Sequence, residues 1–311
     1  MRAVRLHRFG TPLRLDEIDD PVPSEGESVL DVRFAGVNPV DVWLTNGDVA
    51  GGRQRLPFVP GTEATGLVDG QPVLVHGAGV GVSRDGLYAE RAAVPQAAVR
   101  PLPDGTGLAE AAALGVPGST AWLIVHDVAR LTGEDRALVL GATGGVGSLV
   151  VQLARRAGCV VWGQTSSPDK LDFLRGFAPD GAVVASSDQL PAAVADLSPT
   201  VVFDALGGGF TDAAIAAVRP GGRVVLYGTS AGPTGTLDLR AMYKKGVDLR
   251  AYSATFTPDE RIREATEAVL RDLAEGTLRP FVDTVLPLED AEEAHRRLRA
   301  REIRGKLLLA P

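Results

Sequence analysis

The sequence predicts an α/β fold with two domains, one of which contains a doubly wound parallel sheet. At 311 residues the chain is longer than most single hydrophobic cores allow and suits two domains of ordinary size. Short β-type runs broken by proline and glycine fill the first part of the chain, and the pattern changes near residue 114. From there, continuous apolar runs alternate with helix-compatible segments, which indicates a parallel sheet covered on both faces.

Six apolar runs are the candidate strands of this sheet. They lie at 136–141, 159–163, 182–185, 200–205, 223–228 and 248–252, and their alternation with helical segments is typical of the doubly wound arrangement. The earlier part of the chain contains shorter candidates at 28–34, 66–68 and 72–75. After residue 258 the pattern predicts a charged amphipathic helix to about residue 275, a strand at 281–287, a helix at 288–300 and a strand at 306–309. We expect this tail to return to the first domain.

Composition and charge indicate a small-molecule partner. Apolar residues make up 45% of the chain and charged residues 23%, which is typical of a globular protein. A net charge of −7 argues against a nucleic-acid surface, because that affinity comes from clustered Lys and Arg. Cys159 is the only cysteine, so an internal disulfide and a thiolate zinc cage are both excluded. No apolar run reaches the ~18 residues of a membrane span, and we expect a cytoplasmic protein that does not bind a membrane.

The sharpest motif is the sequence GATGGVG at 141–147, directly after a candidate strand and directly before the helical run 148–157. Gly144, Gly145 and Gly147 allow a tight turn and a close backbone approach, so that amide groups and the helix N-terminus can hold a pyrophosphate. The Gly-Lys-Ser/Thr of a nucleoside triphosphatase is absent. A tight strand-to-helix turn without a ligand is the alternative, but the surrounding strands and helices favour a dinucleotide site.

The segment after the second candidate strand favours NADPH over NADH. An NAD site usually has Asp or Glu about 20 residues beyond the first glycine, where it binds the ribose 2′-hydroxyl. Here no acid occurs between 160 and 168, and Ser166, Ser167 and Lys170 could donate to a 2′-phosphate. The alternative roles are helix capping before Pro168 for the two serines, and a solvated helix position for Lys170.

Several segments, taken together and in this order, resemble one protein family over nearly the whole chain. They are GVNPVD at 36–41, PGTEATG at 60–66, the loop at 141–147, TSSPDK at 165–170, DALGG at 204–208, GGRVV at 221–225 and GKLLL at 305–309. This pattern resembles the zinc-independent quinone oxidoreductase branch of the medium-chain dehydrogenase/reductase superfamily. The resemblance implies a GroES-like catalytic domain at 1–113 and 265–311, and a Rossmann domain that binds NADP at 114–264.

The resemblance also implies which residues form the site. In zinc-dependent relatives Cys stands where this chain has Asn38 and His stands where it has Thr62, so we expect no metal. Asn38 could bind the cofactor or a substrate carbonyl, while Asp41 could do the same or only hold its loop. Trp43 could stack on a flat acceptor or pack beneath the loop. The expected cofactor-binding residues are Thr120, Thr143, Gly144, Gly145, Val146, Thr165, Ser166, Ser167, Lys170, Leu206, Gly228, Ser230 and Lys306.

These features predict an NADPH-dependent, zinc-free reductase that transfers hydride to a quinone or an α,β-unsaturated carbonyl. A 2-enoyl-thioester reductase, including the type found beside polyketide pathways, is an alternative. The tyrosine that donates a proton in such enzymes falls at Val49, which cannot donate, so any acid has to come from elsewhere. A non-catalytic NADPH-binding relative is the other alternative. A homodimer is expected, because the strand at 248–252 would lie at a sheet edge that can pair across a two-fold axis.

Overall fold

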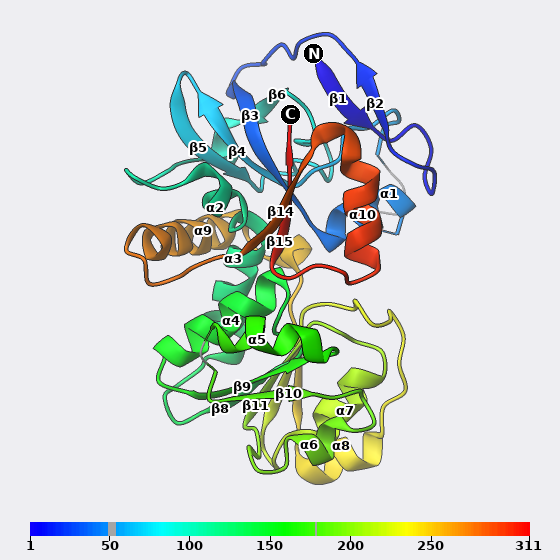
Figure 1. Cartoon of the computed structure of the whole chain (residues 1–311), viewed down its shortest axis with the longest axis vertical. Helices are drawn as coiled ribbons and strands as arrows, with labels where there is room; N and C mark the ends of the chain where they lie inside the picture. The colour runs from blue at the N-terminus through cyan, green and yellow to red at the C-terminus, as the bar shows by residue number, and fades with distance from the viewer. Residues whose placement is uncertain (49–53, 178) are drawn as a thin grey trace. The chain divides into compact units, whose positions relative to one another are not determined.

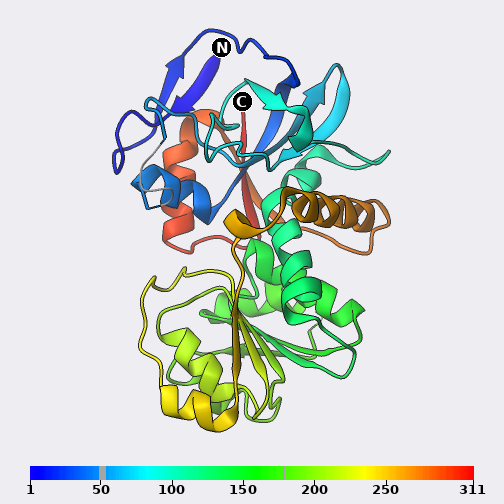
Figure 2. The same ribbon diagram turned by 180° about the vertical axis from the view of Figure 1, so that it is seen from behind.

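The computed structural model describes residues 1–48, 54–177 and 179–311, which divide into two compact units. The first unit comprises Met1–Ser119 and Pro258–Pro311, and the second comprises Thr120–Thr257 (Figures 1 and 2). Helix α9 (Asp259–Ala274) lies wholly in the first unit, whereas the resemblance implies a boundary near residue 264. The reason is packing, since Leu270 of α9 is buried against Leu74 and Leu102 of the first unit.

The second unit is built on six parallel strands in the order β10-β9-β8-β11-β12-β13. The six predicted strands are confirmed, and the chain runs outward from β8 first through β9 and β10 and then, on the other side, through β11, β12 and β13. The two halves of the sheet therefore meet between β8 and β11, which is the switch point at which doubly wound sheets bind ligands. The strands are β8 (Arg136–Val139), β9 (Val160–Thr165), β10 (Gly181–Val184), β11 (Val201–Asp204), β12 (Arg223–Leu226) and β13 (Asp248–Ala251).

Helices cover both faces of this sheet, with α4 and α5 on one face and α6 and α7 on the other (Figure 1). Helix α4 forms because its buried residues recur at helical spacing, with Leu149, Val150 and Leu153 on the side that meets the sheet. The helices of this unit are α3 (Gly115–Leu123), η3 (Ile124–Ala129), α4 (Gly145–Arg156), η4 (Pro168–Lys170), α5 (Leu171–Arg175), α6 (Leu190–Ala193), α7 (Gly209–Ala217), α8 (Leu239–Lys245) and η5 (Ala254–Phe256). Helix α3 begins in the first unit.

The first unit contains a mixed sheet in the order β14-β15-β3-β4-β5-β7, with β6 also paired to β3, and a separate β1-β2 pair. The last strand of the chain, β15, runs antiparallel to β3, and Leu307 lies opposite Val37. This register brings the start of β15 next to the end of β3. The strands are β1 (Arg2–Arg5), β2 (Arg14–Glu17), β3 (Glu27–Val37), β4 (Glu63–Val68), β5 (Gln71–His76), β6 (Arg91–Pro95), β7 (Val99–Pro101), β14 (Val282–Pro287) and β15 (Lys306–Ala310).

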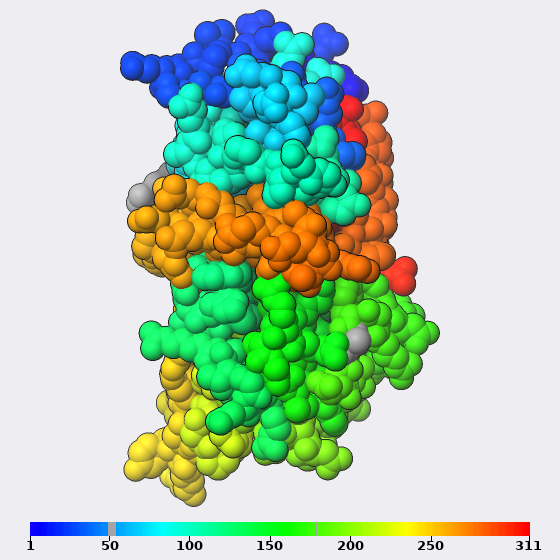
Figure 3. Space-filling view, turned by 90° about the vertical axis from the view of Figure 1, so that its left-hand side faces the viewer, coloured from blue at the N-terminus to red at the C-terminus, as the bar shows by residue number. Residues whose placement is uncertain are grey.

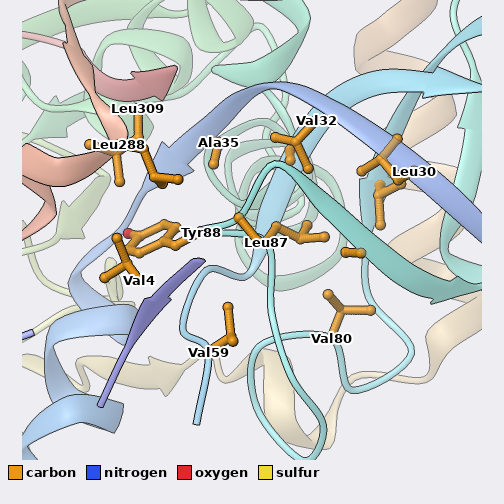
Figure 4. Packing of buried hydrophobic residues seen from close by; sticks show 14 of the residues in the cluster. Val4, Leu30, Val32, Ala35, Val59, Val80, Leu87, Tyr88, Leu288 and Leu309 are labelled. Carbon is orange, nitrogen blue, oxygen red and sulfur yellow. The ribbon is translucent and has the colours of Figure 1, made fainter. Parts of the chain in front are cut away.

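A large apolar cluster fills the inside of this unit, and Tyr88 lies within it beside Leu309 and Leu288 (Figure 4). Helix α9 adds a smaller cluster, and the outer side of this helix lies at the surface (Figure 3). The remaining helices are α1 (Pro39–Asn46), η2 (Gln96–Ala98), α2 (Leu108–Ala112), η6 (Leu288–Asp290) and α10 (Ala291–Arg299). Among the described residues, no helix combines the length and the apolar character that crossing a bilayer requires.

Candidate functional site

The glycine-rich loop between β8 and α4 has the backbone geometry of a phosphate-binding turn. Gly141 has a φ of +65°, a conformation that glycine adopts without strain. A Cβ atom at Gly147 would lie 2.4 Å from the carbonyl oxygen of Gly141, so a side chain there would displace backbone. Gly144 is the N-cap of α4 and lacks a side chain that could satisfy the first amide groups of the helix. These amides are therefore available to an anion.

Gln164 anchors this loop, although sequence analysis did not single it out. Its side chain is 1% exposed, and its Oε1 accepts from the Gly141 amide at 3.1 Å while its Nε2 donates to the Ala185 carbonyl at 2.7 Å. The residue thus joins the carboxyl ends of three neighbouring strands. The signal in the sequence was a polar side chain on an otherwise apolar strand, which is buried only where it is hydrogen-bonded.

The end of β9 brings the predicted 2′-phosphate residues onto one turn. Ser166 is exposed, and Ser167 and Lys170 are half-buried around the short helix η4. Ser167 occupies the N-cap position of η4, and its side chain makes no capping hydrogen bond. The preceding Thr165 is buried, and its hydroxyl has no hydrogen-bond partner among the described residues.

The ends of β11 and β12 complete the same edge of the sheet. Asp204 is fully buried and its Oδ1 accepts from the amides of Leu206 and Gly207 at 2.8 and 3.0 Å, which fixes the turn after β11. The Ser230 hydroxyl donates to the Ala205 carbonyl at 3.1 Å and ties the segment after β12 to this turn. The second unit therefore gathers most predicted cofactor residues at the carboxyl ends of its strands, namely Thr143, Gly144, Gly145, Val146, Thr165, Ser166, Ser167, Lys170, Leu206, Gly228 and Ser230.

In the first unit, Asp41 holds the start of helix α1. Its carboxylate accepts hydrogen bonds from the Asn38 amide at 2.8 Å, the Thr62 hydroxyl at 2.9 Å and the Tyr88 hydroxyl at 3.0 Å. Burial raises the pKa of Asp41 to about 6, and the three donors act in the opposite direction because they favour the charged form. A carboxylate that is fully buried and so engaged stabilises the loop from Asn38 into α1.

A buried cation lies next to Asn38. Lys306, which is 4% exposed, donates from its Nζ to Asn38 Oδ1 and to Glu63 Oε1, and Glu63 is fully buried. Asn38 Nδ2 donates to Glu63 Oε1 at 2.8 Å and to Thr62 Oγ1 at 3.3 Å. Glu63 Oε2 accepts from the Val116 amide at 2.6 Å. The amide of Asn38 is therefore already engaged on both sides, and Lys306 binds within its own unit.

Comparisons with known proteins bear on the family. The model of the zinc-binding dehydrogenase family matches residues 181–309. Quinone oxidoreductase of Sus scrofa is 28% identical over 326 residues, which cover 99% of this chain and 97% of the relative. A crystal structure of an NAD-dependent alcohol dehydrogenase is 29% identical, with a TM-score of 0.92 and full coverage of both chains. The structure of the quinone oxidoreductase from Thermus thermophilus, which is also described in complex with NADPH, is 30% identical with a TM-score of 0.88 and full coverage of both chains.

The chain belongs to the quinone oxidoreductase branch of the medium-chain dehydrogenase/reductase superfamily. It is thus a reductase, and the predicted fold class of a Rossmann domain with a GroES-like domain is confirmed. The mixed sheet of the first unit belongs to the GroES-like domain. The six parallel strands of the second unit belong to the Rossmann domain.

The remaining residues predicted from the quinone oxidoreductase pattern lie in different places. Trp43 is half-buried on α1, Thr120 is buried on α3, and Val49 lies outside the described residues.

The ring of His76 faces the Thr62 carbonyl at 3.3 Å. Within the described ranges, no three His, Cys, Asp or Glu side chains gather as a metal-binding group.

Proposed function

We propose that this enzyme uses NADPH to reduce a quinone or an α,β-unsaturated carbonyl compound without a catalytic metal. The choice of NADPH rests on the edge formed by the 141–147 loop and the Ser166–Ser167–Lys170 turn. This edge offers hydrogen-bond donors, and the sequence has no carboxylate between 160 and 168. The acceptor class is supported by the quinone oxidoreductases among the relatives.

The residues at this edge suit the two charged parts of NADPH, which supplies the hydride when it is bound. The amides at the N-terminus of α4 and the approach left open by Gly144 suit the pyrophosphate. Ser166, Ser167 and Lys170 suit the 2′-phosphate, because hydroxyl and ammonium groups donate to phosphate oxygens. The chain itself then binds, orients and shields the reacting groups.

Metal-free chemistry is supported by the surroundings of positions 38 and 62. The side chains there are an amide and a hydroxyl, and both take part in hydrogen bonds with Glu63 and Asp41. The Lys306 ammonium beside Glu63 would repel a second cation at short range. Elemental analysis of protein purified without chelator is expected to find no stoichiometric metal, and full activity after chelator treatment is the matching functional result.

The alternatives differ in their acceptors. NADPH oxidation measured with a panel of quinones, enones and 2-enoyl thioesters should show turnover with a quinone or an enone. Preference for the thioesters would instead indicate an enoyl-thioester reductase. NADPH binding without turnover of any acceptor would indicate a non-catalytic relative.

Replacing Lys170 with alanine is expected to weaken NADPH binding roughly 10- to 100-fold and to leave NADH binding nearly unchanged, because a charge-assisted hydrogen bond is worth roughly 1.5 to 3 kcal/mol. The difference should shrink as salt rises, since Lys170 is half-buried and its contact is partly screened. Fluorescence titration with both cofactors measures the difference between the NADPH and NADH affinities. Lys244→Ala, at an exposed position on α8, is the matched control. Equal affinities of the wild type for NADPH and NADH would contradict the 2′-phosphate assignment.

A homodimer that pairs the edge strand β13 is part of this proposal. β13 lies at the end of the six-stranded order, and an unpaired edge leaves backbone donors and acceptors open to a second copy. Sedimentation at micromolar concentration should detect twice the 32.5 kDa of the chain, and a monomer alone would exclude this pairing.

A further inference from the structure

The chain contains four tyrosines, and the structure separates them by place. Tyr88 lies in the core of the first unit and donates to Asp41, and Tyr243 is 84% exposed on α8. Tyr227 and Tyr252 directly follow β12 and β13, at the edge of the sheet where ligands bind in doubly wound folds. Two of the four hydroxyls are therefore at the candidate cofactor edge.

These two tyrosines occupy matching positions on neighbouring strands. Leu226 pairs with Ala251, so the next residues, Tyr227 and Tyr252, are level with each other. The backbone confirms this, because the amide of Tyr252 donates to the Leu226 carbonyl at 2.9 Å. The ladder thus extends one residue beyond each strand and holds the backbone of both tyrosines in place.

The side chain of Tyr252 lies on the face of the sheet covered by α3 and η3. Arg250, two residues earlier and hence on the same face, donates to the Val128 carbonyl of η3. The hydroxyls of Thr120 on α3 and of Thr257 lie beside the Tyr252 hydroxyl and lower its pKa. Thr257 is itself fixed by a bond to the Ser253 carbonyl at 3.0 Å. Tyr252 therefore has a defined orientation, and its half-buried side chain is not sealed in the core.

A second observation points to a ligand at this position. The hydroxyl of Tyr227 is buried and has no hydrogen-bond partner among the described residues. Buried hydroxyls are nearly always paired, so an unpaired one at a ligand-binding edge indicates that a polar group of a bound molecule completes it. Asp204, whose oxygens accept from Leu206, Gly207 and Thr211, makes no hydrogen bond to the Tyr227 hydroxyl.

We propose that the Tyr252 hydroxyl, at the carboxyl end of β13, donates the proton that completes substrate reduction. This assignment rests on the proposed function. Hydride added to the β-carbon of an enone forms a C–H bond and moves the electron pair of the C=C bond onto the enolate. The O–H bond of Tyr252 then breaks as its proton passes to the enolate, and water returns a proton to the phenolate. The sum is enone, NADPH and one proton giving saturated ketone and NADP⁺.

The surroundings of Tyr252 suit this step. Burial raises the pKa of Tyr252, so the group is protonated and ready to donate at neutral pH. The neighbouring hydroxyls of Thr257 and Thr120 act in the opposite direction and lower the pKa of Tyr252. General acid catalysis by a positioned side chain contributes roughly 10²- to 10⁴-fold to rate.

The test compares Tyr252→Phe with Tyr243→Phe, which removes the same hydroxyl from an exposed site. Tyr252→Phe is expected to lower kcat with an enone by about 100-fold or more, while the NADPH Kd, measured by fluorescence without acceptor, stays within about twofold. A small added acid such as imidazolium should raise the rate of Tyr252→Phe with increasing concentration and leave the wild type unchanged. Tyr243→Phe should match the wild type in every measurement.

Three results would overturn the assignment. They are a kcat of Tyr252→Phe equal to that of Tyr243→Phe, a loss of NADPH affinity that accounts for the loss of rate, and a reduced rate that added acid does not restore. In each case an active wild type would leave the proposed function standing. A wild type that binds NADPH but reduces no acceptor would remove the proposed function, and this assignment with it.

Discussion

Replacing Lys306 with methionine is expected to lower the free energy of unfolding by about 3 to 5 kcal/mol, because it leaves the buried carboxylate of Glu63 without its cation. The Asn38 amide and the Val116 amide still donate to Glu63, but neither neutralises its charge. Methionine has nearly the length of the lysine stem, so the loss reports mainly on charge. Urea unfolding at pH 7 measures the change.

Two further variants separate the ion pair from other effects of the substitution. Lys306→Met combined with Glu63→Gln removes both charges, and it should recover much of the lost stability because no unpaired buried charge remains. Lys244→Met, at an exposed position on α8, should unfold like the wild type within about 0.5 kcal/mol. A Lys306→Met variant as stable as Lys244→Met would show that the pair contributes little.

Replacing Gly147 with alanine is expected to weaken NADPH binding by on the order of 100-fold or more. The new methyl group would lie 2.4 Å from the Gly141 carbonyl oxygen and 2.9 Å from Ala142 Cα, so the loop has to move. Loss of two charge-assisted amide bonds to phosphate would cost roughly 3 to 6 kcal/mol. Cofactor titration measures the affinity, and thermal unfolding should also show a destabilisation of about 1 to 3 kcal/mol.

Gly144→Ala is the informative partner of this variant. The nearest atom to a Cβ at Gly144 is the Gly141 carbonyl oxygen at 3.4 Å, an ordinary contact, so the free energy of unfolding should fall only by the cost of alanine at an N-cap, about 1 kcal/mol or less. The methyl group would nevertheless stand at the N-cap of α4, where the pyrophosphate is expected to approach. Affinity should therefore fall with little loss of stability. Undiminished NADPH binding by both variants would place the dinucleotide elsewhere.

The Rossmann part was predictable because its signals are local. Apolar runs such as that of β11 and the glycine loop before α4 each fall within about a dozen residues, and their alternation defines a parallel sheet. The 141–147 loop and the Ser166–Ser167–Lys170 turn were found in the same way. The 2′-phosphate site after β9 was predicted from two local features, namely the absence of a carboxylate and the presence of three hydrogen-bond donors.

The polar network of the first unit was not predictable, because it joins residues far apart in sequence. Lys306 and Glu63 are 243 residues apart and meet through the pairing of β15 with β3 and of β3 with β4. The resemblance assigned Lys306 to the cofactor, and the structure gives its ammonium two partners, Asn38 and Glu63. The contact between Tyr252 and Thr120 likewise depends on how α3 packs on the sheet, which no local pattern encodes.

Transfer of deuterium to an enone from NADPH that carries deuterium at both C4 positions, followed by mass spectrometry of the product, tests the central claim most directly. The protein should first be treated with a chelator and shown by elemental analysis to hold no metal. The proposed chemistry predicts that one deuterium appears at the β-carbon of the product and none in solvent. Transfer that requires added zinc, or NADPH oxidation without deuterium in the product, would contradict it.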